Sequence, residues 1–232
     1  MYDFLMPLER AERGSTTERV YAALRDAIVH RLLKPGELID KNLVCERLGV
    51  SRFPVSEALG RLGQQGFAEV LPQRGTRVSR IRLQDVRQNL LIRRALEAET
   101  VGELARRADA ALLERIAVNV EAQRAMLDGA ESGAFYELDL EFHAILQEAL
   151  GYPRVTSTID AARAGLDRVR RMLGSLHRHA ITFGEHALVA DAIRTGDAGL
   201  AADAMRRHID SVTTHLADFA AEHPDMFSRD GA

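Results

Sequence analysis

The sequence predicts a mostly α-helical protein in two parts, and two observations lead to this expectation. Ala, Leu and Arg, which favour helices, dominate the composition, whereas aromatic residues make up 5% of the 232 residues and Trp is absent. Apolar residues recur at helical spacing through most of the chain, and patterns typical of strands are confined to the stretch before Arg80. The expected parts are a flexible arm over 1–15, a winged helix-turn-helix domain over 16–80, an all-α bundle of about six helices over 81–222 and a tail over 223–232.

Composition and charge indicate a water-soluble protein of the cytoplasm with no membrane partner. No apolar run approaches the roughly 20 residues of a membrane span, and the N-terminus has no basic segment followed by an apolar core. The single Cys45 excludes an internal disulfide framework. The formal net charge is −3, but residues 1–80 carry 13 Lys and Arg against 10 Asp and Glu. This modest basic excess favours contact with phosphates in the first part of the chain.

The first part begins with the pattern of two helices. One is expected from about Thr16, because apolar residues follow at steps of four and form one stripe, namely Val20, Leu24, Ile28 and Leu32. The run Lys34-Pro35-Gly36 predicts the turn that ends it. Asp40 can then cap a second helix that extends to Leu48.

The stretch Leu48–Phe67 predicts a third helix that is presented to an external partner. Ser51 can cap it, since its hydroxyl can accept a hydrogen bond from a first-turn N–H, and Pro54 suits that first turn. This arrangement places Arg52 near the helix N-terminus and Arg61 further along. A second helix that carries cations after a short turn is typical of a helix-turn-helix that reads the DNA major groove.

Two short strands are expected after this helix, at Phe67–Leu71 and Thr76–Ser79. The sequence PQRG lies between them, and its Gly75 can adopt a positive φ in a tight turn. We expect this hairpin to form a wing.

These motifs, GVSRFPVSEALGRL with the preceding LKPGELIDKNLVCERL and the following EVLPQRGTRV, resemble the winged helix-turn-helix of GntR-type bacterial transcriptional regulators. The resemblance covers about 19–78. It implies that Arg52 and Arg61 lie on the recognition helix and that Arg74 and Gly75 form a wing tip near the minor groove, whereas any one of these arginines can instead be a solvated surface charge. The expected DNA-binding residues are Lys41, Arg47, Ser51, Arg52, Arg61, Arg74 and Gly75.

Three positions of the third helix depart from the family pattern. Ser56 and Gly60 stand where many members carry arginines, and Phe53 replaces the usual small hydroxyl residue before the proline. The preferred operator sequence therefore cannot be transferred from relatives.

The second part of the chain shows only helical patterns from Leu83 to Phe219. The segments between these helices include the turn signals Gly151-Tyr152-Pro153, Gly174-Ser175 and Gly196. The expected helices span 85–107, 110–127, 134–150, 153–173, 176–195 and 197–222.

Four residues in this part could together bind a metal ion. Asp139 and His143 lie four apart, which places both on one helix face, and His186 and His208 lie on two other expected helices. Three imidazoles and one carboxylate suit a divalent ion such as Zn, Ni or Mn. The spacing does not decide the matter, because the chain has eight His residues and isolated histidines on helices are often surface or hydrogen-bonded core groups.

The segments RRALEAETVGELA, DLEFH and EHALVADAIRTGDAGLAADAMRRHI are similar to the FCD effector domain of the FadR branch of GntR regulators. Six helices resemble its shorter VanR-like subgroup. The resemblance implies that Asp139, His143, His186 and His208 coordinate a divalent ion. It also implies that Arg93 faces an effector pocket, where its charge would attract a small carboxylate. The alternative for Arg93 is a salt bridge with Glu97, and the surface is expected for His177, His179, His215 and His223.

The leading hypothesis is a transcriptional regulator, in this family most often a repressor, and not an enzyme. It would bind a pseudo-palindromic operator as a homodimer and respond to a small organic acid bound at the metal. Two alternatives remain: a His/Asp metalloenzyme of hydrolytic type, with Glu141 and Glu185 near the ligands in sequence, and a purely structural ion that ties three helices together.

Overall fold

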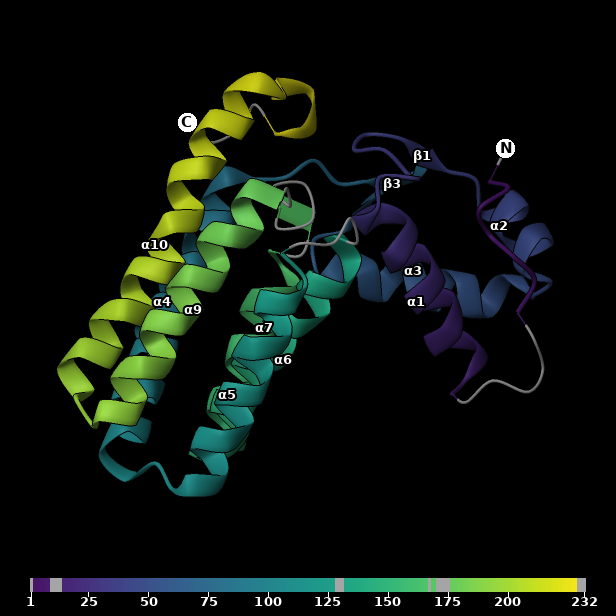
Figure 1. Ribbon diagram of the computed structural model, residues 1–232. Coiled ribbons are helices and arrows are strands. Elements are labelled where there is room, and N and C mark those ends of the chain that lie inside the picture. Colours follow the sequence, from purple (N-terminus) through teal and green to yellow (C-terminus); the bar gives the residue numbers. More distant parts are fainter. Residues whose placement is uncertain (1, 9–13, 128–131, 167, 170–175, 229–232) are drawn as a thin grey trace. The chain divides into compact units, whose positions relative to one another are not determined.

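The computed structural model describes residues 2–8, 14–127, 132–166, 168–169 and 176–228, and it divides the chain into two compact units (Figure 1). The N-terminal unit comprises Met1–Asp85 together with Glu222–Ala232, and the helical unit comprises Val86–Ala221. None of the described helices is both long and apolar enough to cross a membrane.

Three helices form the core of the N-terminal unit: α1 (Thr16–Val29), α2 (Lys41–Leu48) and α3 (Arg52–Gln64). Helix α1 begins with a capping box, in which the Ser15 hydroxyl accepts from the N–H of Glu18 and the Glu18 carboxylate accepts from the N–H of Ser15. Asp40 caps α2, as expected, by accepting two backbone N–H groups. Helix α3 packs against α1 and α2 over buried leucines and valines, and this apolar contact fixes the helix-turn-helix.

The cap of α3 differs from the expectation. Ser51 occupies the N-cap position in extended backbone, but its side chain makes no capping hydrogen bond. A capping hydroxyl bonds the N–H of the second or third helical residue, and the third residue here is Pro54, which has no N–H. The proline that favours the first turn thus removes one of the two donors that Ser51 would use.

The wing is a three-stranded antiparallel sheet in the order β1-β3-β2. Strands β2 (Ala68–Leu71) and β3 (Gly75–Val78) form the expected hairpin, with Leu71 opposite Gly75. Strand β1 (Leu38–Ile39) was not expected, because two residues are too short to show an alternating pattern; it pairs with Arg77 and Thr76 of β3. Gly75 has φ +96° at the tip, as the turn requires.

Residues 2–8, expected to belong to a flexible arm, pack against the helix-turn-helix core. Tyr2 and Leu5 are buried, and the Tyr2 hydroxyl donates to the carbonyl of Leu38. The N–H of Leu8 donates to the carbonyl of Leu48, which ties the segment to the end of α2. Burial of these apolar side chains stabilises the packed segment. Hydrophobic periodicity did not predict it, because periodicity identifies helices and strands but not an extended segment.

The C-terminal segment, expected to be a tail, also packs within the N-terminal unit. The short 3-10 helix Pro224–Met226 is followed by Phe227, which forms an isolated parallel bridge with Ile81. The N–H of Ile81 donates to the carbonyl of Met226, and the N–H of Ser228 donates to that of Ile81. Met226, Phe227 and Ile81 are all buried. The segment thus packs against the stretch that follows β3.

The helical unit follows the expected order of helices with small shifts at their ends. Its elements are α4 (Leu83–Arg107), which starts in the N-terminal unit, α5 (Ala110–Ala125), α6 (Ser132–Leu150), α7 (Pro153–Ala164), α9 (Leu176–Thr195) and α10 (Ala198–Glu222). Helix α5 packs against α6 and α9. An ion pair between Arg94 and Asp210 joins α4 to α10.

One helix end is wrong in the expectation. Helix α7 ends at Ala164 rather than near residue 173, and Gly165 at its C-cap lies directly against Asn89 of α4. A Cβ on Gly165 would come within 2.3 Å of the Asn89 amide nitrogen, so a larger residue there would require the Asn89 side chain to move. Residues 168–169 are helical again, and the break expected at Gly174-Ser175 lies outside the described residues.

Candidate metal centre and DNA-binding surface

Three helices bring the four expected ligands together in the interior of the helical unit. Asp139 and His143 come from α6, His186 from α9 and His208 from α10, and each is at most 2% exposed. One ligand atom from each residue lies within 4.8 Å of all the others. The ring centroids of His186 and His208 are 4.6 Å apart, and that of His143 is 5.3 Å from both. Asp139 and His143, which helical spacing places on one face, thus form a compact cluster with His186 and His208.

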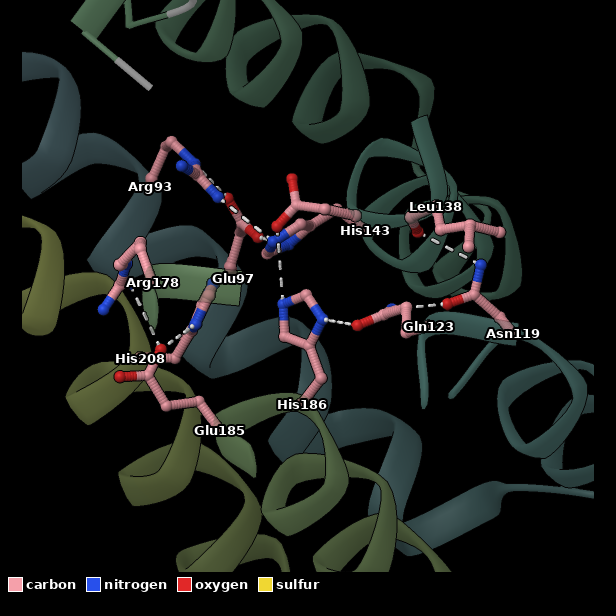
Figure 2. Close-up of polar contacts among 11 residues, drawn as sticks. Arg93, Glu97, Asn119, Gln123, Leu138, His143, Arg178, Glu185, His186 and His208 are labelled. Carbon is pink, nitrogen blue, oxygen red and sulfur yellow. Dashed lines mark hydrogen bonds and ion pairs between the residues drawn. The ribbon is translucent and has the colours of Figure 1, made fainter. Parts of the chain in front are cut away.

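Each histidine of this cluster is held at Nδ1 by an acceptor. His186 Nδ1 is 2.9 Å from Gln123 Oε1, and His208 Nδ1 is 2.9 Å from a carboxylate oxygen of Glu185 (Figure 2). His143 Nδ1 contacts the carboxylate of Glu97. A carboxylate or amide oxygen at Nδ1 selects the tautomer with its proton there and leaves the Nε2 lone pair for coordination.

A backbone carbonyl settles the orientation of Gln123. The Asn119 amide nitrogen donates to the carbonyl of Leu138 at 3.1 Å, so its oxygen faces Gln123 and accepts from the Gln123 amide nitrogen at 2.7 Å. Gln123 therefore turns its own oxygen toward His186, whose Nδ1 must donate (Figure 2). These hydrogen bonds connect the carbonyl of Leu138, which precedes the ligand Asp139, with the ligand His186. They fix the tautomer of His186.

Arg93 and Glu97 form a buried ion pair beside His143. Arg93 Nε donates to Glu97 at 2.6 Å, so the salt bridge considered from the sequence is present. Another guanidinium nitrogen, Nη2, lies 3.4 Å from His143 Nε2, so Arg93 also borders the cluster (Figure 2). Burial raises the pKa of Glu97, but the charge of Arg93 and the contact with His143 outweigh this effect and hold that pKa well below its usual range. Burial lowers the pKa of His143, which favours the neutral imidazole that a metal requires.

Other basic and aromatic groups complete the surroundings. Arg178 is 3.3 Å from the Glu185 carboxylate that holds His208, and Phe142 stacks on the His186 ring with 4.0 Å between centroids. His179 is buried and stacks on Phe135, so its expected place at the surface is wrong. His179 directly follows the buried Arg178 on α9. A single histidine on a helix does not show from the sequence whether its side chain is buried.

The residues expected to bind DNA lie at or near the surface of the N-terminal unit. Three of them are exposed, namely Arg52 and Arg61 on α3 and Arg74 in the wing turn. Arg52 donates to the Asn42 side chain at 2.5 Å, and the Arg61 guanidinium lies 4.0 Å from the ring centroid of Tyr21. These contacts position both cations without burying them. Of the other expected residues, Arg47 forms an ion pair of 2.5 Å with Asp3 on the N-terminal segment, and Lys41 is the half-buried first residue of α2.

Comparison with known proteins decides the family. Residues 16–78 match the model of bacterial regulatory proteins of the gntR family, and residues 89–211 match the FCD domain. An uncharacterized HTH-type transcriptional regulator in an unstable DNA locus of Streptomyces ambofaciens is 34% identical over 224 residues, which are 94% of this chain and 93% of that protein. The HTH-type transcriptional repressor RspR of Escherichia coli K12 is 30% identical over 218 residues, 92% of this chain and 94% of RspR. The chain belongs to the GntR family.

Solved structures share the fold of this GntR-family protein. E. coli McbR/YncC matches with a TM-score of 0.73 at 17% identity, covering 89% of this chain and 99% of that chain. A putative GntR regulator from Rhodococcus sp. RHA1 matches with a TM-score of 0.65 at 23% identity, covering 93% of this chain and all of that chain (100%). The expected GntR family and FCD domain are thus confirmed. The protein is a transcriptional regulator and not an enzyme, so the hydrolytic alternative is not retained.

Sequence reasoning missed the residues that orient the ligands in this GntR-family protein. Asn119 and Gln123 follow Leu112 and Ile116 on the buried side of α5, so two amides interrupt an apolar stripe at helical steps. Such buried amides need partners, and this pattern was the available signal. Glu97 was considered only as a partner of Arg93, although it also contacts His143.

Removing the oxygen that holds His186 is expected to weaken metal binding. The Gln123→Ala variant should bind a divalent ion about 10- to 100-fold more weakly, because His186 loses the acceptor that selects its tautomer. Competition against a chromophoric chelator measures this affinity on protein shown to be folded by circular dichroism. The control is Gln88→Ala, the same change at an exposed site of α4. Equal affinities for both variants would contradict the role given to Gln123.

Proposed function

We propose that this GntR-family regulator is a repressor that binds operator DNA as a homodimer in the cytoplasm and responds to a small carboxylate at a divalent metal. The buried cluster of Asp139 and three histidines beside Arg93 carries this proposal. The name of its relative RspR, a transcriptional repressor, supports the direction of regulation. The winged helix-turn-helix and the cluster lie in different units, which separates DNA binding from ligand sensing.

The donor set fits a divalent transition metal. Three neutral imidazoles and one carboxylate suit Zn, Ni or Mn, whereas Ca and Mg prefer sites made of oxygen atoms. Bonds of about 2.0–2.2 Å place opposite ligands up to about 4.4 Å apart, close to the 4.8 Å that encloses the four ligand atoms. When bound, the ion would supply an open coordination position for an anion. Asp139, His143, His186 and His208 would hold it.

Arg93 would orient the carboxylate of the effector. Its Nε is occupied by Glu97, but its Nη2 faces His143 at the cluster. A carboxylate at the ion could therefore accept from this nitrogen and gain a charge-assisted hydrogen bond. The buried Arg163, whose charge acts on both Glu97 and His143, adds to the positive potential there. These groups favour an anionic effector over a neutral or cationic one.

The effector would act by shifting the population of two arrangements of the protein. A ligand that binds one arrangement about 100-fold better supplies about 2.7 kcal/mol, which changes operator occupancy strongly. Helices α4 and α10 carry Arg93 and His208, and both continue into the N-terminal unit. They are the elements through which the effector would act on the DNA-binding residues.

The proposed contacts to DNA are made by α3, the wing tip and α2. Arg52 and Arg61 would contact bases or phosphates from α3, and Arg74 with Gly75 would enter the adjacent minor groove. The stacking of Arg61 on Tyr21 limits how far its guanidinium can reach. Phosphate contacts are assigned to the remaining set, Lys41, Arg47 and Ser51.

Loss of the Arg52 side chain is expected to weaken operator binding about 10-fold or more, because a good arginine contact to a base edge contributes about 1–3 kcal/mol. Fluorescence anisotropy with selected operator DNA at fixed salt measures the change for Arg52→Ala. The control Arg106→Ala removes the same charge from an exposed position of α4 in the helical unit. Unchanged affinity for Arg52→Ala would remove this residue from the readout set.

The sensing part of the proposal is tested by metal analysis together with a screen of small carboxylates. The expected result is about one divalent ion per chain, and an acid that raises the melting temperature and releases operator DNA only while the ion is present. If chelation melts the helical unit and no acid changes DNA binding, the ion is structural.

A further inference from the structure

Helix α3 exposes a large apolar side chain at its N-terminal end. Phe53, its second residue, is 72% exposed, the highest value among the exposed large hydrophobic residues of the described part of the chain. Its chain neighbours Pro54 and Val55 are buried and attach this turn to the core. The phenyl ring is therefore held at the surface by rigid backbone and contributes little to the core of its own unit.

The face of α3 around Phe53 is small and open. Ser56 and Gly60 follow Phe53 at steps of three and four, so all three lie on one side of the helix, and all three are exposed. A Cβ on Gly60 would meet nothing within 4 Å, so the packing of this chain does not require a glycine there. A low surface beside a projecting ring lets another molecule approach the helix backbone closely and surround the ring.

We propose that Phe53 reads thymine in the operator by packing against the 5-methyl group in the major groove. This inference rests on the proposed role of α3 as the recognition helix, whose N-terminal residues reach base edges. A phenyl ring cannot pair with a phosphate or form a hydrogen bond to a base. The thymine methyl is the apolar group that the major groove offers, and phenylalanine is one of the side chains that contact it.

Arg52 places this contact next to a polar one. The side chain of Asn42 on α2 holds the guanidinium of Arg52. Arg52 and Phe53 are successive residues in the first turn of α3. One of them can read a hydrogen-bonding base edge and the other a methyl group. Each half-site of the operator therefore contains a thymine whose methyl group contributes to affinity.

The experiment replaces thymine by deoxyuridine, which pairs identically but has no methyl group. Binding sites are first selected from random duplex DNA with the full-length protein, and each thymine of the selected site is then replaced symmetrically in both half-sites. Affinities of the wild type, Phe53→Ala and Leu32→Ala are measured by fluorescence anisotropy at fixed salt. Leu32 is an exposed apolar residue in the turn after α1 and serves as the matched control.

At one thymine per half-site, deoxyuridine should weaken the wild type and Leu32→Ala about fourfold per half-site, the effect of one buried methyl-sized group. Phe53→Ala should bind the thymine site more weakly and show no further loss with deoxyuridine. The inference is overturned if no replacement affects the wild type, or if Phe53→Ala keeps the full penalty. Failure of the wild type to select any sequence would overturn the proposed function as well, a result distinct from the other two.

Discussion

Replacing His186 by alanine is expected to lower the affinity for a divalent ion about 100-fold. Structural zinc sites bind with about 10–16 kcal/mol, so one of four ligands accounts for about 3 kcal/mol on average. His186 is fully buried, and its Nε2 lies 3.7 Å from the Asp139 carboxylate, so the variant loses a donor at the centre of the cluster. Metal titration of chelator-treated protein measures the affinity, and elemental analysis of the purified protein measures the metal content.

The same variant should lose most of its stabilisation by metal. An ion that binds the folded state stabilises it in proportion to the logarithm of its concentration over Kd, so a 100-fold weaker site loses about 2.7 kcal/mol at a given excess of metal. Thermal unfolding with metal and with chelator measures this difference. The control is His30→Ala, which removes an exposed imidazole at the end of α1. A metal content equal to that of the wild type would count against the four-ligand site.

Replacing Glu97 by alanine is expected to lower the free energy of unfolding by about 3–5 kcal/mol. Glu97 is 3% exposed, accepts from Arg93 and contacts His143, so its loss leaves the Arg93 charge buried without its carboxylate. The nearby charge of Arg163 increases this cost, because it too is balanced in part by Glu97. The effect is large because a buried charge without its partner carries a desolvation cost that is not compensated.

Urea denaturation of the full-length chain, followed by circular dichroism, measures this loss. Most of the helices lie in the helical unit, so its unfolding dominates the signal. The control Glu99→Ala removes the same charge from an exposed position two residues further along α4, and it should change stability by less than about 0.5 kcal/mol. If both variants were equally stable, the Arg93–Glu97 pair would have no net role in the fold.

Local patterns predicted the helices and the helix-turn-helix because their causes act within a few residues. The cap at Asp40, the apolar stripe from Val20 to Ile28 and the turn before Gly75 depend on neighbouring groups, which the sequence displays directly. The same holds for Asp139 and His143, whose spacing places them on one face of α6. The missing cap of Ser51 was also readable in principle, since Pro54 offers no N–H.

Contacts between distant segments were decided by packing, which periodicity does not encode. Gly165 lies directly against Asn89, and burial of Tyr2 and Phe227 attached both end segments to the N-terminal unit. The approach of His186 and His208 to Asp139 and His143 on α6 was expected from a family resemblance. The spacing alone did not identify these two among the eight histidines of the chain. The acceptors that orient these rings come from other helices, so their roles follow from the way the helices pack in three dimensions.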